Sequence, residues 1–351
     1  MQSFRSLDDR LGMLPASLVK ALAMIEAGRG RQEAFARQSP MLLESLRQVA
    51  VIQSVEASNA IEDIRVPARR LRAIALDKVI PTDRPEAEIT GYRRVLEEIH
   101  TNAPNIPFTE NVVLQFHGWL YSFTSARAGQ YKFGENAVTE THPDGTVVVR
   151  FQPVRRAETP ESMRELHQRF DQASATAEYH PLLLLAAYVF DFLMIHPFQD
   201  GNGRMSRLIT SLLLFHAGFE VGRYVGWEKL IEDSRETYYE ALSRSTTGWH
   251  DGAHDLFPWL SYFLSILIAA YQQLEERVDL GSGRGSKTAA VEHFVRTNLS
   301  DVFTIADVRK VAPHVGDQMI GNILRRLKAE GVLSAEGAGR GASWRRLRRD
   351  F

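Results

Sequence analysis

The segment from residue 181 to residue 207 constrains the fold most strongly. It begins with a run of mostly apolar residues, Pro181 to Phe190, which meets Asp191 before it is long enough to span a bilayer. The run therefore predicts a helix buried in a protein core. A polar stretch with the sequence HPFQDGNGRMSR follows from His196 to Arg207, and its two glycines place a turn where the next helix would begin.

The turn in this stretch combines groups suited to phosphate chemistry. Successive backbone N–H groups at Gly201, Asn202 and Gly203 can converge on an anion, and the start of a helix adds its positive dipole end. The Asn202 side chain is expected to be an additional donor. The imidazole of His196 has an ordinary pKa of about 6.5 and can accept a hydroxyl proton at neutral pH. Asp200 can hold magnesium, whose other ligands would be water and substrate phosphates.

Arg204 and Arg207 lie three residues apart on the first turn of the following helix. Two guanidinium groups at this spacing can bind different phosphates. The whole stretch therefore indicates phosphoryl or nucleotidyl transfer. The alternative is an ordinary helix N-terminus with a solvated histidine, and the concentration of these groups in one polar window argues against it.

Residues 196–207 match every position of the motif HPFx(D/E)GNGRxxR, and the sequence in this way resembles the Fic family. The resemblance implies an all-α fold, a Fic-fold helical bundle, and transfer of AMP from ATP to a Ser, Thr or Tyr hydroxyl of a protein, the enzyme itself included. It implies that His196 is the base, that Asp200 holds Mg²⁺ and that Arg207 engages the γ-phosphate of ATP. The ATP-binding residues implied in the motif are Gly201, Asn202, Gly203, Arg204, Met205, Ser206 and Arg207. Gly203 stands where phosphate-transferring relatives carry lysine, which favours AMP transfer.

Residues 129–154 predict a small β-hairpin, because strand-forming residues flank a turn at Pro143–Gly145. The hairpin resembles the family's flap, which lies over the nucleotide and takes the target peptide as an extra strand. Ala137 and Val138 are the expected ATP-binding residues at the flap edge. The alternative is a plain surface hairpin.

A helical segment further along resembles the family helix that helps to close the adenine pocket. Tyr238, Tyr239 and Thr246 are its candidate ATP-binding residues. Aromatic pairs on helices also fill protein cores, and the sequence leaves that alternative open.

The segment Ser58–Asp63 resembles the family's inhibitory motif, [S/T]xxxE[G/N], in the class that carries it N-terminal to the catalytic motif. The resemblance implies that Ser58 and Glu62 are inhibitory and that Glu62 pairs with Arg207. A carboxylate that occupies an arginine competes directly with a phosphate for the same donors. Asp63 departs from the pattern, which has Gly or Asn there. The alternative is a solvated glutamate near a helix end.

Four parts are predicted along the chain. Residues 1–100 are a helical region carrying the inhibitory motif, and its first helix is expected to break at a Gly-Arg pair near residue 28. Residues 101–279 are the catalytic core, residues 280–286 a Gly- and Ser-rich linker, and residues 287–351 a C-terminal module.

The C-terminal module predicts three helices followed by a two-stranded wing and resembles a winged helix-turn-helix domain. It contains 12 Lys and Arg against 7 Asp and Glu, a net charge of +5, whereas the whole chain has −1. Arg340, Arg345 and Arg346 on the wing suit phosphate contacts, which makes DNA a candidate partner. Winged helices also serve as docking or dimerisation modules, so a homodimer is open as well.

The chain contains no cysteine, which excludes disulfides, thiolate catalysis and thiolate metal sites. Together with a polar N-terminus this favours a cytoplasmic protein with no membrane segment. Two functional alternatives remain beside AMP transfer. One is removal of AMP from a modified protein, in which Glu62 would orient a water; the other is a DNA-binding regulator whose core only senses a nucleotide. The intact His196 argues against a mere sensor.

Overall fold

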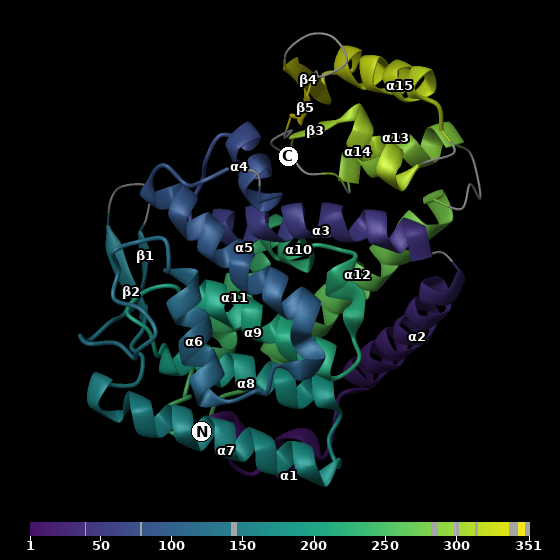
Figure 1. Ribbon diagram of the computed structural model, residues 1–351. Coiled ribbons are helices and arrows are strands. Elements are labelled where there is room, and N and C mark those ends of the chain that lie inside the picture. The colour runs from purple at the N-terminus through teal and green to yellow at the C-terminus, as the bar shows by residue number, and fades with distance from the viewer. Residues whose placement is uncertain are drawn as a thin grey trace.

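The structure is a computed structural model that describes all residues except 39, 78, 142–145, 282–286, 298, 300–301, 313–314, 337–342 and 348–351. Most described residues are helical, and the strands form two small sheets (Figure 1). The fold is therefore all-α in class, as the sequence predicts. The turn at Pro143–Gly145, most of the linker and Arg340 lie outside the described residues.

The α-helices and strands follow one another in a fixed chain order. The helices are α1 (Leu7–Leu11), α2 (Ala16–Gln38), α3 (Pro40–Ile61), α4 (Ala68–Ala75), α5 (Arg84–Asn102), α6 (Glu110–Leu120), α7 (Thr159–Thr176), α8 (Pro181–Ile195), α9 (Asn202–His216), α10 (Trp227–Asp233), α11 (Arg235–Thr246), α12 (Phe257–Gly281), α13 (Lys287–Thr297), α14 (Ile305–Val311) and α15 (Asp317–Ala329). The strands are β1 (Val138–Thr141), β2 (Val147–Phe151), β3 (Val302–Thr304), β4 (Leu333–Glu336) and β5 (Ser343–Arg346).

The helices α8 and α9 form the centre of the bundle. Pro181 occupies the first turn of α8, where its fixed φ suits a helix and its missing N–H costs nothing. Every residue from Leu182 to Ile195 is buried, so the apolar run forms a core helix as predicted. Because α9 packs against α8 and is buried almost as completely, the loop between the two helices is held by the core on both sides.

The first long helix differs from the sequence-based prediction. A break near residue 28 is predicted, but α2 continues without interruption through Gly28 and Gly30. α2 packs lengthwise against α12, and its buried residues include Leu18, Leu22 and Ile25. This packing outweighs the helix penalty of a glycine, about 1 kcal/mol.

The helix α3 runs between the bundle and the C-terminal elements (Figure 1). It packs on α5 and α10 on the bundle side and on α14 on the other. The Asp307 carboxylate at the start of α14 pairs with Arg72 of α4 at 2.5 Å, and Lys310 donates to the Gln48 side chain of α3 at 2.8 Å. The two helices that flank residues 62–67 therefore both contact the C-terminal module.

The C-terminal residues contain the three predicted helices, α13, α14 and α15. The predicted wing is the antiparallel pair β4 and β5. A third strand, β3, which the sequence did not predict, pairs with β5 through Phe303 and Trp344, so the sheet order is β3-β5-β4. The predicted boundaries at residues 100 and 280 both fall inside helices, α5 and α12.

No helix among the described residues combines the length and apolarity needed to cross a membrane.

Candidate functional site

His196 ends the buried helix α8 and begins the loop that carries the motif. Its backbone is left-handed, with φ +51°, and its N–H caps the helix by donating to the Phe192 carbonyl at 2.9 Å. The Nδ1 atom lies 3.2 Å from the Leu193 carbonyl. Because a carbonyl can only accept, Nδ1 carries the hydrogen and Nε2 keeps its lone pair. The histidine is thus in the tautomer that a base needs.

The surroundings of His196 favour its neutral form. Burial lowers the pKa of the imidazole to about 4, and the nearby Lys132 ammonium acts in the same direction. The hydrogen bond to the Leu193 carbonyl and the carboxylates of Glu62 and Asp200 oppose this shift. At neutral pH the ring is therefore uncharged and able to take up a proton.

Asn202 holds the motif loop together through both ends of its amide. Its Oδ1 accepts from the Phe198 N–H at 2.9 Å, and its Nδ2 donates to the Phe198 carbonyl at 2.8 Å. The expectation that this side chain is an extra anion donor is not met, because the amide is buried and committed to the loop. Gly201 follows the loop with a left-handed φ of +81°.

The N-terminus of α9 offers main-chain N–H groups to an anion. Helical hydrogen bonding begins with the Met205 N–H, which donates to the Gly201 carbonyl at 2.9 Å. The N–H groups of Asn202, Gly203 and Arg204 precede it and have no partner within the helix. The side chains of Met205 and Ser206 are buried, and the Ser206 hydroxyl donates to the Gly203 carbonyl at 2.7 Å. A phosphate would therefore meet the main chain of residues 202–204.

The structure brings Ser58, Glu62 and Arg207 together, as the inhibitory motif predicts. Arg207 Nη2 lies 2.7 Å from Glu62 Oε1 and 2.8 Å from the Ser58 carbonyl, and Nε donates to the Ser58 hydroxyl at 2.7 Å. Burial is the largest single influence and opposes the charge of the guanidinium, but the Glu62 carboxylate together with Tyr238 and Tyr92 outweighs burial and raises the pKa of Arg207. The residue expected to bind the γ-phosphate is thus occupied by a carboxylate.

Asp63 explains why Gly or Asn is usual at the end of the inhibitory motif. It lies two residues after Ile61, the last residue of α3, and has a left-handed φ of +58°, a conformation that favours glycine and asparagine. The Asp63 carboxylate pairs with Arg235 at the start of α11, at 3.2 and 3.3 Å. The departure from the motif therefore keeps the helix ending and adds a contact across the site.

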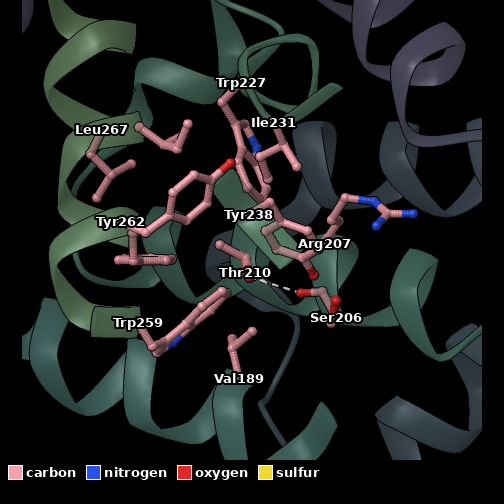
Figure 2. Close-up of a pocket in the computed structure, with 12 residues that line it drawn as sticks. Val189, Ser206, Arg207, Thr210, Trp227, Ile231, Tyr238, Trp259, Tyr262 and Leu267 are labelled. Atoms are coloured by element: carbon pink, nitrogen blue, oxygen red, sulfur yellow. Dashed lines mark hydrogen bonds between the residues drawn. The ribbon is translucent and has the colours of Figure 1, made fainter. Parts of the chain in front are cut away.

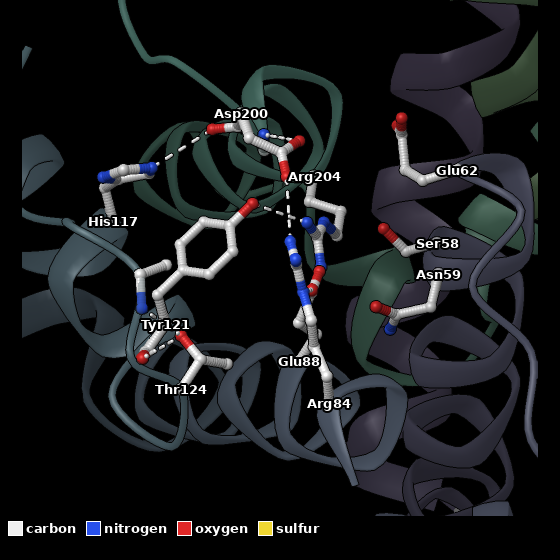
Figure 3. A network of polar contacts seen from close by, with 12 residues as sticks. Ser58, Asn59, Glu62, Arg84, Glu88, His117, Tyr121, Thr124, Asp200 and Arg204 are labelled. Carbon is white, nitrogen blue, oxygen red and sulfur yellow. Dashed lines mark hydrogen bonds and ion pairs between the residues drawn. The ribbon is translucent and has the colours of Figure 1, made fainter. Parts of the chain in front are cut away.

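Arg204 differs from the expectation that it binds a phosphate. Its side chain is buried, its Nη1 pairs with Glu88 at 2.8 Å, and its Nη2 donates to the Tyr121 hydroxyl at 2.7 Å (Figure 3). Glu88 also accepts from Arg84 at 2.7 Å, so one carboxylate of α5 holds two guanidinium groups. We correct the expectation accordingly: the first motif arginine is engaged in packing the motif against α5.

Asp200 lies at the open side of this network. Its side chain is 62% exposed, and its Oδ2 lies 3.9 Å from Arg84 Nη2 (Figure 3). No group of three or more His, Cys, Asp or Glu residues that could hold a metal occurs in the described parts of the chain. A single accessible carboxylate beside a phosphate-binding helix end still fits Mg²⁺, which prefers few protein ligands, water and substrate phosphates.

His117 positions the backbone of the Asp200 loop, a role that no local sequence pattern indicates. Its Nδ1 accepts from the Gly129 N–H at 3.0 Å, so Nε2 carries the hydrogen and donates to the Asp200 carbonyl at 3.2 Å. Its ring stacks on Phe198 with centroids 3.8 Å apart. The contacts with Phe198 and Asp200 join residues more than 80 positions apart, a separation at which local periodicity carries no signal.

The predicted hairpin is present as β1 and β2. The strands are antiparallel, and the pairing shifts between Val138 and Thr139. Val138 is half-buried and Ala137 is exposed, while the side chains of Val147 and Val149 on β2 are exposed. An open two-stranded hairpin of this kind leaves backbone groups for an added strand.

The candidate adenine residues lie in different surroundings. Tyr238 is buried among Trp227, Trp259 and Tyr262 and lines a cavity of about 20 Å³ behind Arg207 (Figure 2). Tyr239 is 45% exposed. The third candidate, Thr246, lines a separate open cavity of about 400 Å³ beside β2. The structure thus does not bring Tyr238 and Thr246 into one cavity.

Comparison with known proteins gives a consistent result. The Fic/DOC family model matches residues 107–214. The chain is 42% identical over 65 residues to a Fido domain-containing protein of Dictyostelium discoideum, covering 17% of this chain and 46% of that protein. It is 24% identical over 212 residues to the protein adenylyltransferase Fic of Nematostella vectensis, covering 57% and 44%. The matches therefore span less than half the length of these relatives.

Solved structures share the fold. A Fic family protein from Desulfovibrio desulfuricans matches with a TM-score of 0.61 and 21% identity, over 97% of this chain and 98% of that one. Fic-1 of Caenorhabditis elegans matches with a TM-score of 0.57 and 19% identity, over 73% and 72%. The segment matched by the family model contains α6, the hairpin, α8 and the loop from His196 into α9. Residues 107–214 of the chain therefore form a Fic domain, and the chain shares the fold of solved Fic family proteins.

Proposed function

We propose that the protein transfers AMP from ATP to a hydroxyl group of a protein, itself included, and that Glu62 restrains this reaction. The observation that carries the proposal is that the side chains of Ser58 and Glu62 both accept hydrogen bonds from Arg207. These contacts lie directly beside the N-terminus of α9. A carboxylate placed on an arginine at an anion-binding helix end is a substitute for a phosphate. The names of the relatives as protein adenylyltransferases support the same chemistry.

The proposed transfer begins at Nε2 of His196. This atom takes the proton of the target hydroxyl as its oxygen forms a bond to the α-phosphorus of ATP. The bond from that phosphorus to the bridging oxygen of the β-phosphate breaks, and pyrophosphate leaves. The left-handed backbone of His196 and the hydrogen bond from Nδ1 to Leu193 hold the ring in place, so base catalysis of about 10²–10⁴-fold is available.

The phosphates would be bound by two groups of donors. The main-chain N–H groups of residues 202–204 face an anion at the start of α9, where the helix dipole adds to their effect. The Arg207 guanidinium would bind the γ-phosphate once Glu62 releases it. Mg²⁺ at Asp200 would neutralise phosphate charge when bound. For this, the exposed Asp200 carboxylate would have to leave the distant contact of its Oδ2 with Arg84, and its Oδ1 accepts from the Gly201 N–H at 2.6 Å.

The hairpin would present the target. Its exposed strands can add a peptide strand through main-chain hydrogen bonds, which fixes a hydroxyl with loose sequence preference. Ala137 and Val138 at the start of β1 would then cover the nucleotide. Tyr239, with its half-exposed ring, is the aromatic candidate best placed to meet an adenine.

The experiment that tests the proposed function is incubation with labelled ATP and magnesium. We expect label on the protein itself, weakly for the wild type and strongly for Glu62→Gly. His196→Ala in the Glu62→Gly background serves as the negative control. Absence of label from Glu62→Gly protein that still binds ATP would overturn the proposal.

We further propose that residues 287–351 are a winged-helix module that docks on α3 and α4. The Arg72–Asp307 pair supports this. We do not propose DNA binding, because basic residues of the described module are engaged with acidic ones of the same module. Arg326 pairs with Glu292, and Arg345 with Glu336 at 2.5 Å.

A further inference from the structure

The ammonium group of Lys132 is buried between the hairpin and the loop that follows α8. Its Nζ donates to the Val154 carbonyl at 2.6 Å, to Asn136 Oδ1 at 2.8 Å and to the Ile195 carbonyl at 3.2 Å. Only 4% of the surface of Lys132 is exposed to solvent. All three ammonium protons therefore have acceptors, which come from three separate segments of the chain.

These three segments are the two ends of the hairpin and the residue that precedes the proposed catalytic base. Val154 follows β2, Asn136 precedes β1, and Ile195 is the last residue of α8, immediately before His196. The main chain of Lys132 adds a fourth link, because its N–H donates to the Pro197 carbonyl at 2.8 Å. One residue thus joins both ends of the hairpin to both neighbours of the base.

Asn136 extends the connection to the base itself. Its Nδ2 donates to the His196 carbonyl at 3.2 Å and to the Phe198 carbonyl at 2.9 Å, while its Oδ1 accepts from Lys132. Its carbonyl accepts from the Gln152 side chain at 3.1 Å, next to the end of β2. The amide therefore lies between the ammonium and the loop and has a partner at each end.

A buried ammonium held only by neutral oxygens is costly to desolvate, and an apolar side chain of similar length would avoid that cost. Burial lowers the pKa of Lys132 to about 8, which reflects this cost. The position at the C-terminal end of α8 offsets part of it, because a cation there interacts favourably with the helix dipole.

We propose that Lys132, acting through Asn136, is a positioning residue that fixes the β1–β2 hairpin relative to the His196 ring. A hydroxyl presented along the hairpin then meets Nε2 at a constant place and distance. The inference rests on the proposed function for its consequence in transfer, whereas the mechanical link can be measured without any reaction. Lys132 itself touches neither nucleotide nor target.

The charge of Lys132 has a second effect on the same base. It disfavours protonation of His196, in the same direction as burial, while Glu62, Asp200 and the Leu193 carbonyl act in the opposite direction. Removal of the ammonium should therefore move the acid limb of the pH profile to higher pH. A side chain that serves only to fill space would not produce this shift.

The test compares Lys132→Met and Asn136→Ala, each made in the Glu62→Gly protein, with Lys20→Met as the control on the exposed face of α2. We expect kcat for auto-modification to fall at least about tenfold in both, since small misplacements of reacting groups are costly. ATP affinity measured by calorimetry should stay unchanged. Lys132→Arg, which restores a cation, should recover part of the lost kcat.

Hydrogen exchange without ATP measures the link itself. Lys132→Met and Asn136→Ala should raise exchange in residues 136–138 and 196–198, and Lys20→Met should not. Unchanged exchange and unchanged kcat in both variants would overturn the proposal, as would an equal loss of ATP affinity and kcat. If Lys132→Met fails to fold, the kcat and the hydrogen exchange of Asn136→Ala decide whether the proposal holds. If the Glu62→Gly protein with Lys132 intact transfers nothing, the proposed function fails, and the exchange data still judge the link.

Discussion

The carboxylate of Glu62 lies directly against the backbone of Gly203, so that a Cβ on this glycine would be 2.2 Å from Oε1. Heavy atoms cannot approach so closely, and any larger residue at position 203 must displace the Glu62 side chain. The contact between Glu62 and Arg207 therefore depends on two residues far apart in the chain: the acid that makes it and Gly203, which leaves room for it.

This relationship gives the first prediction. Gly203→Ala should raise auto-modification in the wild-type protein, because the added methyl group displaces Glu62 from Arg207. The same substitution in the Glu62→Gly background should give no increase, since the group to be displaced is already gone. A double-mutant cycle on initial rates measures this non-additivity. An equal effect in both backgrounds would show that position 203 acts on the nucleotide alone.

Glu62→Gly should raise auto-modification by more than about tenfold, because the buried Arg207 guanidinium becomes available to the γ-phosphate. Glu44→Gly on the exposed face of α3, the helix that ends just before Glu62, is the control and should leave the rate unchanged. Removal of AMP from modified protein, the competing reaction, should instead be lost in Glu62→Gly if this glutamate orients water. Assays in both directions on auto-modified protein separate the two reactions. An unchanged transfer rate would mean that Glu62 does not restrain the enzyme.

His196→Ala should abolish transfer while ATP binding stays intact, because no other group in the motif can take the hydroxyl proton. Rates of the Glu62→Gly protein with and without this change, at saturating ATP, provide the measurement. Retention of more than about a tenth of the activity would exclude His196 as the base, because a general base contributes at least 10²-fold. Circular dichroism serves as the control for folding.

The lowered pKa of His196 predicts an unusual pH profile. Burial shifts this pKa from 6.5 to about 4, so the charged form, which cannot accept a proton, appears only at low pH. The value of kcat/KM should therefore stay level from neutral pH down to about pH 5 and decline below that, because the free enzyme's pKa governs this parameter. A midpoint near the ordinary value for histidine would show that the imidazole is solvated in the free enzyme.

Asp200→Ala and Arg207→Ala should weaken binding of ATP with magnesium more than binding of adenosine. Both residues are proposed to act on phosphates and metal, and neither is expected to contact the adenine ring. Calorimetry with the two ligands gives the comparison, and Arg244→Ala on the exposed part of α11 is the control. Equal losses for both ligands would place these side chains in the adenine site or in general stability.

The sequence predicted the elements that carry strong local patterns. The buried helix α8 follows from its apolar run, the hairpin from its flanked turn, and the Glu62–Arg207 pair from the inhibitory motif. It failed where distant segments decide the outcome. Arg204 was expected to bind a phosphate, because its actual partner, Glu88, lies 116 residues away and no local pattern links the two residues. Lys132 and His117 were missed for the same reason, since most of their hydrogen-bond partners are backbone atoms of other segments.

The left-handed backbone of His196 bears on how this site can change over evolutionary time. A φ of +51° is rare for residues other than glycine, and asparagine, aspartate and histidine tolerate it best. Few substitutions of His196 are therefore compatible with the fold, because most other side chains would strain the backbone of this loop. A lineage that gave up the reaction would be expected to settle on Asn, Asp or Gly at this position.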